Sequence, residues 1–208
     1  MDHSPAAPAV ATATGAKIVG CAPLVLHDDG PRADAGFDPS YAPDVVMVDG
    51  DSISGPDWTL TAVATPGHTS NHLCFALPQE KALFTGDHVM GWSTTVVAPP
   101  DGDMAAYMAS LKKLLDRDET IYHPTHGEPV TDTHRFVRGL ITHRRQREAQ
   151  ILRLLRHEPQ AIPAMVGQMY AKVDPRLHGA AGRSVLAHLI DLRNRGRVVD
   201  AGDCWALV

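Results

Sequence analysis

The chain has 208 residues, 44% of them apolar, and a formal net charge of −5, which suffices for one full domain and a smaller second one. It contains no run of about 18 apolar residues and no basic-then-apolar start, so we expect a cytoplasmic protein that does not span a membrane. Its three cysteines lack CxxC spacing, which argues against a disulfide framework and against a thiolate metal site.

The charge is divided unevenly along the chain. Residues 1–142 contain 8 Lys and Arg against 18 Asp and Glu, whereas residues 143–208 contain 11 against 6. We therefore predict two domains that meet between residues 142 and 143. A basic tail can bind nucleic acid, but such a helix face is more often solvated or docked on an acidic domain.

The first part of the chain predicts one helix followed by short strands. The helix is expected over residues 6–15, capped by Ser4 with Pro5 at its first position. Apolar patterning predicts strands over 16–19, 45–48 and 58–64, and the Gly, Pro and Asp content predicts a loop over 26–40.

The central stretch 65–88 reads TPGHTSNHLCFALPQEKALFTGDH and predicts a β-hairpin. Two short apolar runs, 73–77 and 82–84, are separated by a polar turn. Such a hairpin presents His68 and Asp87 from loops at the same end of a sheet. An imidazole and a carboxylate held by rigid strands are suitable metal ligands.

A helix is predicted after this hairpin, with Asp103 as its N-cap and an end near residue 115. Its apolar residues at helical spacing are expected in the core: Met104, Met108, Leu111, Leu114 and Leu115. A short strand over 121–122 then leads into the loop HPTHGEP, so His126 also stands at a strand end.

The tail predicts three helices and a hairpin, over residues 132–157, 162–172, 180–195, 197–199 and 204–207. The first helix is expected to carry its arginines opposite the apolar residues Ile141, Ile151, Leu154 and Leu155; the arginines are Arg144, Arg145, Arg147, Arg153 and Arg156. This order of elements is typical of a winged helix.

His68, Asp87 and His126 each stand where a strand gives way to a loop, and Asp2 and His3 add a further carboxylate and imidazole. Nitrogen and oxygen ligands without sulfur suit a catalytic zinc better than a structural one.

These motifs resemble those of the metallo-β-lactamase superfamily. TPGHTSNH, LFTGDH and HPTHGEP are similar to its third, fourth and last histidine motifs, and MDHSPAAPAVATATGA resembles the end of its HxHxDH motif and the helix that follows. The tail resembles the winged-helix extension of the lactamase-β-like protein 2 subgroup. The resemblance implies an α/β fold, an αββα sandwich incomplete at its N-terminus, with a small winged-helix-like α+β domain behind it.

The resemblance also implies roles for single residues. Asp2, His3 and His126 would bind a second zinc ion, Asp87 would bridge two zinc ions, and His68 would bind the first. The two histidines of HxH are not in this sequence, so we expect an N-terminally truncated form of a longer protein that binds one zinc ion or binds zinc weakly. Asp2 and Asp87 would act in catalysis.

The implied function is hydrolysis by a metal-bound hydroxide. The substrate is an ester or thioester-type acyl compound or a single-stranded RNA, and these stay open. The alternative is a catalytically impaired form that acts as a binding or regulatory module through its winged helix. DNA is not an expected partner, because the third tail helix has few base-reading side chains.

Other residues near these motifs leave two readings open. His72 and His88 either form supporting hydrogen bonds or simply pack. Trp92 and the loop over 96–101 either wall a substrate cleft or cover a core.

Overall fold

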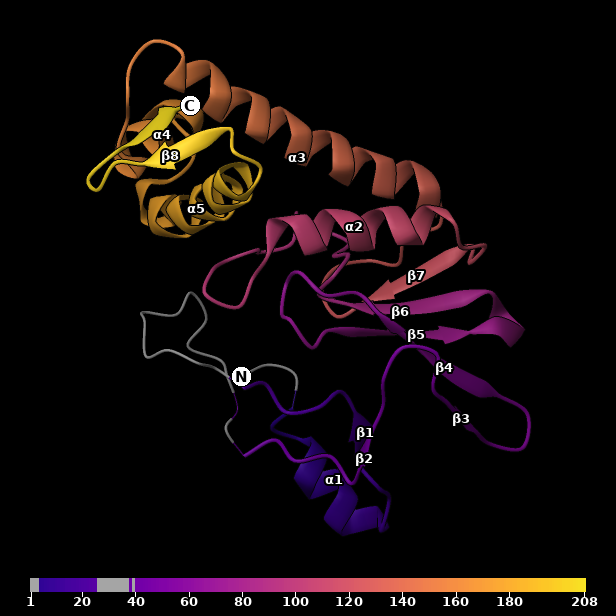
Figure 1. Ribbon diagram of the computed structural model, residues 1–208. Coiled ribbons are helices and arrows are strands. Elements are labelled where there is room, and N and C mark those ends of the chain that lie inside the picture. The colour runs from indigo at the N-terminus through magenta and orange to yellow at the C-terminus, as the bar shows by residue number, and fades with distance from the viewer. Residues whose placement is uncertain (1–3, 26–37, 39) are drawn as a thin grey trace.

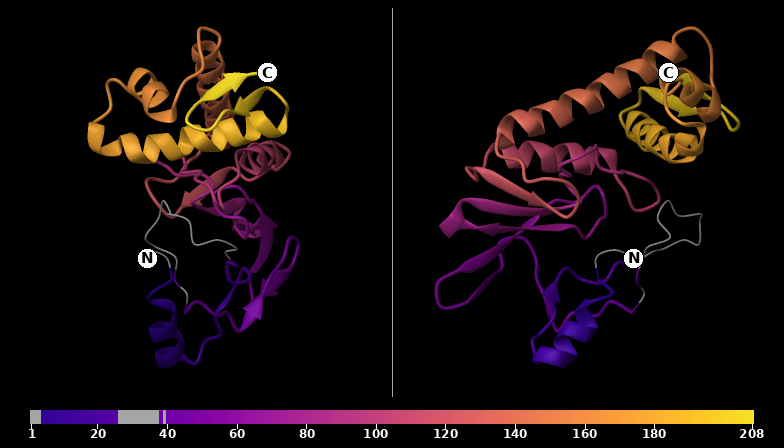
Figure 2. Two further views of the ribbon diagram at one scale, coloured as in Figure 1. Left: turned by 60° about the vertical axis from the view of Figure 1, so that its left-hand side comes forward. Right: turned by 180° about the vertical axis from the view of Figure 1, so that it is seen from behind.

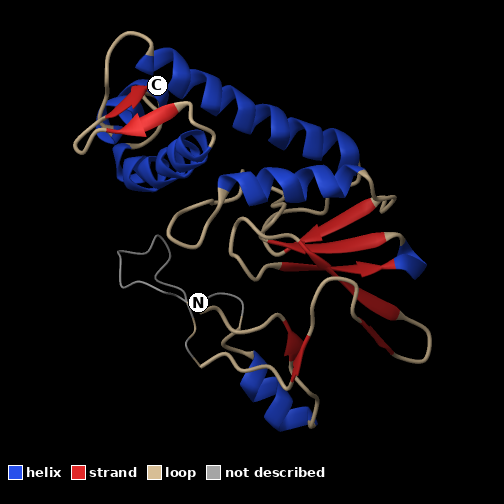
Figure 3. Cartoon of the chain, in the orientation of Figure 1, coloured by secondary structure: helices blue, strands red, loops and turns tan. Residues whose placement is uncertain are grey.

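A computed structural model describes residues 4–25, 38 and 40–208, and the chain is arranged in layers around a five-stranded sheet (Figures 1 and 3). In spatial order the sheet contains β3 (Ser52–Ser54), β4 (Thr59–Ala64), β5 (Leu73–Leu77), β6 (Ala82–Gly86) and β7 (Ile121–Pro124). Neighbouring strands are antiparallel except for β6 and β7, which are parallel. Strands β4, β6 and β7 therefore run in one direction, and their carboxyl ends lie at the same end of the sheet.

The predicted hairpin is confirmed by β5 and β6, which are joined by the 3₁₀ turn η1 (Pro78–Glu80). Strand β3 has no counterpart among the predicted strands. Its side chains are polar at two of three positions. It pairs with β4 as an antiparallel strand, and hydroxyl contacts of 2.9 Å add to this pairing between Ser52 and Thr61 and between Ser54 and Thr59. A hydrophobic pattern could not indicate such a strand.

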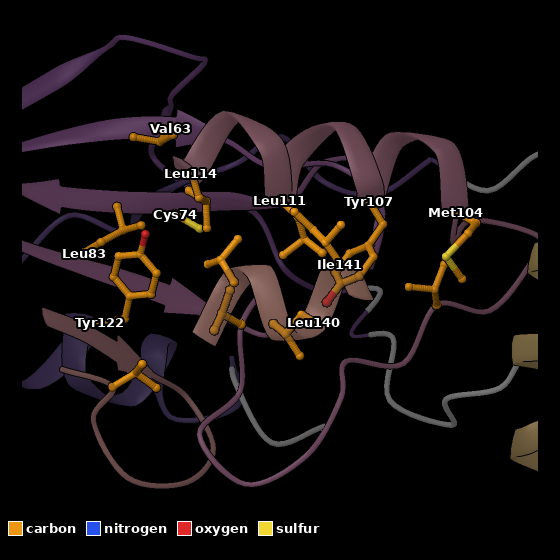
Figure 4. Packing of buried hydrophobic residues seen from close by; sticks show 14 of the residues in the cluster. Val63, Cys74, Leu83, Met104, Tyr107, Leu111, Leu114, Tyr122, Leu140 and Ile141 are labelled. Carbon is orange, nitrogen blue, oxygen red and sulfur yellow. The ribbon is translucent and has the colours of Figure 1, made fainter. Parts of the chain in front are cut away.

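Helix α2 (Met104–Leu115) lies against one face of the sheet, and α3 (Thr133–Leu155) packs beside α2 (Figures 1 and 2). Helix α2 begins as predicted, because the Asp103 carboxylate accepts a hydrogen bond of 2.7 Å from the Ala106 N–H. Its predicted apolar face is confirmed as core: Met104, Leu111 and Leu114 are buried, and Met108 and Leu115 are partly buried. Figure 4 shows Met104, Leu111 and Leu114 in one cluster with Val63, Cys74, Leu83 and Tyr122 of the sheet and with Leu140 and Ile141 of α3.

On the other side of the sheet lie α1 (Ala7–Thr14) and the parallel pair β1 (Val19–Gly20) and β2 (Val45–Val46) (Figures 1 and 2). The predicted cap of α1 is wrong, because its N-cap is Ala6. The Ser4 carbonyl accepts from the Ala7 N–H in a turn before the helix, and the Ser4 hydroxyl donates instead to the Asp38 carboxylate at 2.8 Å.

The tail continues from α3 into α4 (Ile162–Met169), η2 (Pro175–Leu177), α5 (His178–Asn194) and the antiparallel hairpin of β8 (Val198–Asp200) and β9 (Trp205–Leu207). The predicted order of three helices and a hairpin is confirmed. Trp205 also exchanges two main-chain hydrogen bonds of 2.9 Å with Gln160. These bonds connect the hairpin to the segment just before α4.

Helix α3 is shared by two hydrophobic clusters. Ile141 is buried in the cluster of the sheet and α2, whereas Ile151 is buried in the cluster of α4, α5 and the hairpin. The predicted boundary between residues 142 and 143 falls inside this continuous helix, and it stays a prediction. The expectation that the five arginines lie opposite the apolar residues is wrong at Arg144. This residue is only 4% exposed, and the loop before α2 and helix α5 supply partners for it.

None of the helices in the described part of the chain is long and apolar enough to cross a membrane.

Candidate active site

The loops that follow β4, β6 and β7 bring His68, Asp87 and His126 together at the carboxyl end of the sheet. His68 Nε2 lies 3.6 Å from Asp87 Oδ2, and His126 Nε2 lies 3.5 Å from Asp87 Oδ1. All three side chains are partly buried. The carboxylate therefore stands between two imidazole rings, and each ring faces a different oxygen.

The position of His68 depends on a close contact with α2. Gly67 has a φ of 134°, and a Cβ at this residue would lie 2.3 Å from the Tyr107 Cα. The Asp103 N–H donates to the Gly67 carbonyl at 3.0 Å. Only glycine allows the loop to pack this closely on the first turn of α2, so the sheet and the helix together place His68.

The His68 ring is oriented by a main-chain carbonyl. Its Nδ1 lies 2.6 Å from the Val96 oxygen. Because a carbonyl can only accept, Nδ1 carries a proton, and Nε2 is the ring nitrogen that faces Asp87. This is the tautomer in which a histidine binds a metal through Nε2.

His72 contacts the main chain of Asp87 through a hydrogen bond. Of the two roles considered for His72, hydrogen bonding or packing, the structure supports the first. The Asp87 N–H donates to His72 Nε2 at 3.2 Å, and His72 Nδ1 lies 2.8 Å from the Thr65 hydroxyl. Gly86, with a φ of 52°, leaves room for this ring, since a Cβ there would lie 2.8 Å from His72 Nε2. His72 thus has the hydrogen-bonding role.

His88 has the packing role. Its side chain is fully buried, and its ring packs edge-on against Tyr107 with 5.1 Å between the ring centroids. Burial lowers the pKa of His88 from 6.5 to about 3. This histidine therefore belongs to the neutral core beneath the site.

His126 is bordered by the loop after β6. The Gly91 N–H donates to the His126 carbonyl at 2.8 Å, and the Trp92 ring stacks on the His126 ring with 6.0 Å between centroids. Trp92 is 73% exposed, so it covers no core. It forms an exposed apolar surface against His126.

Sequence patterns did not indicate the hydrogen bonds that the short segment Thr95–Val96 makes at the site. The Thr95 hydroxyl donates to the main-chain carbonyls of Asp87, at 2.8 Å, and His88, at 2.9 Å, while Val96 contributes its carbonyl to His68. These contacts are made by a hydroxyl and by main-chain oxygens in an irregular loop. No pattern of residue types in the sequence could indicate them.

The donor atoms of the site fit metal ions in kind, because they are imidazole nitrogens and carboxylate oxygens. In the part of the chain that the structure describes, no three His, Cys, Asp or Glu side chains are grouped to hold one ion. The two imidazoles face different oxygens of Asp87, so these three side chains would hold a metal only together with further ligands. The predicted ligands Asp2 and His3 lie outside the described residues.

The fold and these motifs agree with comparisons to known families. Residues 1–126 match the profile of the metallo-beta-lactamase superfamily, and residues 161–205 match the beta-lactamase associated winged helix domain. The chain therefore belongs to the metallo-beta-lactamase superfamily.

Individual relatives narrow the comparison. A beta-lactamase-like protein 2 homolog of Caenorhabditis elegans is 37% identical over 124 residues, 59% of this chain and 41% of the relative. An atrochrysone carboxyl ACP thioesterase of Aspergillus fumigatus is 38% identical over 120 residues, 56% of this chain and 37% of the relative. The matched regions thus span about two fifths of the length of these curated relatives.

Two solved structures show the same fold. One is a metallo-beta-lactamase family protein of Thermus thermophilus, with a TM-score of 0.71 and 23% identity over 81% of this chain and 55% of that one. The other is a beta-lactamase domain protein of Burkholderia ambifaria, with a TM-score of 0.73 and 22% identity over 83% of this chain and 54% of that one.

Proposed function

We propose that the chain carries the centre of a metal-dependent hydrolase in which His68, Asp87 and His126 are metal ligands. The single observation that carries the proposal is the Asp87 carboxylate, whose two oxygens face His68 Nε2 and His126 Nε2 at 3.6 and 3.5 Å. Asp2 and His3, which lie outside the described residues, are proposed as further ligands, and Asp2 is proposed to act in catalysis together with Asp87. Zinc is the proposed metal, because its preferred ligands are nitrogen and oxygen donors of this kind.

The chain's own residues prepare this site in three ways. Val96 fixes the tautomer of His68, His72 holds the main chain of Asp87, and Trp92 provides an apolar surface. When bound, a divalent metal supplies a nucleophile at neutral pH, because it lowers the pKa of the water that it binds to about 7. No side-chain nucleophile is required.

The proposed substrate is an acyl thioester. Two features support this class: a curated relative is named as an ACP thioesterase, and Trp92 offers an exposed ring beside the site on which an acyl group can rest. The site residues alone do not distinguish an ester from a thioester. Single-stranded RNA is the other substrate that the sequence left open, and the basic tail is the feature in its favour.

The decisive experiment measures hydrolysis of an acyl-coenzyme A by the purified chain, with added zinc and after removal of metal by a chelator. We expect weak turnover that requires metal and that changes little between low and high salt. Cleavage of a single-stranded RNA with binding that weakens steeply as salt rises would instead identify RNA as the substrate. Absence of any metal-dependent hydrolysis would contradict the proposal.

The same preparation tests metal loading. We expect one zinc ion per chain, or zinc that a chelator removes readily, because the described residues supply only one imidazole at each oxygen of Asp87, His68 at one and His126 at the other. Two tightly bound zinc ions measured by elemental analysis would contradict this expectation.

The non-enzymatic alternative requires an exposed reading helix in the winged-helix domain. The face of α5 that carries Ser184, His188, Leu192 and Arg195 packs towards α3: His188 and Leu192 are buried, and Arg195 donates to Glu148 at 2.7 Å. This face is therefore not free to enter a DNA groove. DNA binding by the full chain in a gel-shift assay would revive the regulatory function.

A further inference from the structure

Arg144 is a buried cation at the place where the two parts of the chain meet. It projects from the middle of α3 and is 4% exposed. Its guanidinium lies over the Tyr107 ring of α2, 5.2 Å from the centroid, and its Nη1 donates to the Ser184 hydroxyl of α5 at 3.4 Å. One side chain thus contacts α2 and the winged-helix domain at once.

The third contact of Arg144 is with the segment that supports the active site. Its Nη2 donates to the main-chain carbonyl of Thr95. The hydroxyl of the same residue donates to the Asp87 carbonyl at 2.8 Å, and the next residue, Val96, accepts the Nδ1–H of His68 at 2.6 Å. The segment Thr95–Val96 therefore contacts two of the three proposed ligands. Arg144 in turn contacts this segment through the Thr95 carbonyl.

The partners of Arg144 make this arrangement demanding. Within the described residues no carboxylate forms an ion pair with Arg144. The partners of its guanidinium are instead a main-chain carbonyl, a hydroxyl and the face of an aromatic ring. A buried charge that lost the Thr95 carbonyl would be left poorly hydrogen-bonded. The guanidinium resists movement of the Thr95 main chain for the same reason.

We propose that Arg144 is a positioning residue, which fixes the segment Thr95–Val96 and thereby orients His68 and Asp87, and which makes this orientation depend on Ser184 of the winged-helix domain. The roles of His68 and Asp87 rest on the proposed function. The orientation itself does not, because it can be observed in the chain without metal and without substrate.

Helix α3 offers a matched control one turn further along. Arg147 is also partly buried and has the same kinds of partner: it donates to the Met169 carbonyl at 3.3 Å, and its guanidinium lies over the Tyr170 ring, 4.3 Å from the centroid. These partners belong to α4 and the turn that follows it, and they have no contact with the segment Thr95–Val96. Arg147→Met therefore removes an equivalent contact without the proposed connection to the site.

The experiment compares the full-length wild type with Arg144→Met, Arg144→Lys, Ser184→Ala and Arg147→Met. The first measurement is ¹⁵N NMR of the histidine rings in metal-free protein, with His68 assigned by comparison with His68→Gln. We expect a single Nδ1–H tautomer of His68 in the wild type and in Arg147→Met. Arg144→Met should show a mixture of tautomers, and Arg144→Lys, which keeps a charged donor, should recover part of the wild-type signal.

The second measurement is hydrolysis by the zinc-loaded proteins. Arg144→Met should lower kcat roughly 10- to 100-fold, with a much smaller change in KM, since loss of groups that orient metal ligands has effects of this size. Arg147→Met should stay near the wild type. Ser184→Ala should shift both measurements in the same direction as Arg144→Met, by less.

The proposal is overturned if Arg144→Met matches Arg147→Met in both tautomer signal and kcat. If Arg144→Met does not fold, Arg144→Lys and Ser184→Ala decide, and wild-type behaviour of both overturns it. A wild type that hydrolyses no acyl thioester would defeat the proposed function alone. An altered His68 tautomer in the Arg144 variants would still support the positioning role.

Discussion

The two parts of the chain are built around separate hydrophobic clusters, and only one of them supplies the proposed ligands in the described residues. The sheet cluster, which includes Leu83, Leu111 and Ile141, lies beneath the strand ends that present the site. The tail cluster, which includes Ile151 and Leu189, joins the second half of α3 to α4, α5 and the hairpin. Strand ends can place side chains from distant segments close together, whereas Ser184 of the tail contacts Arg144, which in turn donates to the Thr95 carbonyl.

The largest expected difference between the two parts concerns activity. His126→Ala should lower kcat/KM for an acyl thioester by more than the roughly 100-fold that loss of a supporting residue costs, because it removes a proposed ligand. His157→Ala, an exposed histidine after α3, is the matched control and should leave kcat/KM unchanged. Equal losses in the two variants, measured at the same zinc content, would contradict the placement of the site.

The second comparison concerns stability. Leu83→Ala and Leu189→Ala each empty a fully buried position, one in each cluster, and each should lower the free energy of unfolding by about 2–5 kcal/mol. Because α3 contributes to both clusters, we expect the whole chain to unfold in one transition as urea is raised. Fluorescence and circular dichroism should both report that same transition. Leu207→Ala, at a position 36% exposed, is the mild control. A separate early transition in Leu189→Ala would show that the tail unfolds alone.

The third comparison uses pH and concerns a histidine of the tail. Burial, together with the nearby charge of Arg144, lowers the pKa of His188 from 6.5 to about 3. The folded chain keeps this ring neutral while the unfolded chain binds a proton below pH 6.5, so stability is lost as pH falls from 6.5 towards 3. Between pH 8 and pH 5 this histidine should cost about 2 kcal/mol.

His188→Gln does not titrate, so its stability should fall less between pH 8 and pH 5 than that of the wild type. Urea unfolding of both proteins at the two pH values measures the difference. If the wild type and His188→Gln lost the same stability between pH 8 and pH 5, protonation of His188 would not be the cause of that loss.

The smallest expected effect concerns the helix that supports His68. Asp103→Ala removes the side-chain cap of α2 and should lower the free energy of unfolding by about 1 kcal/mol. Asp132→Ala is the matched control at the start of α3, where the carboxylate forms no cap hydrogen bond, and it should have a smaller effect. Equal effects in thermal unfolding would assign the loss at Asp103 to charge and not to capping.

Local patterns predicted the elements whose causes are local. The hairpin of β5 and β6 follows from two apolar runs and a polar turn, and α2 follows from its cap and its apolar spacing. Patterns failed where a more distant partner decided. Ser4 binds Asp38 instead of capping α1, and β3 pairs with β4 as an antiparallel strand with added hydroxyl contacts.

The sequence by itself determined which chemical groups stand at the ends of the strands: His68, Asp87 and His126 each follow an apolar run that forms β4, β6 or β7. Only the tertiary structure decided how these groups are oriented. The directions of the strands bring the carboxylate between the two rings, and the carbonyl of Val96 selects the ring nitrogen of His68 that faces it. Main-chain oxygens are the same in every residue, so their part in the site becomes visible only when the chain is folded.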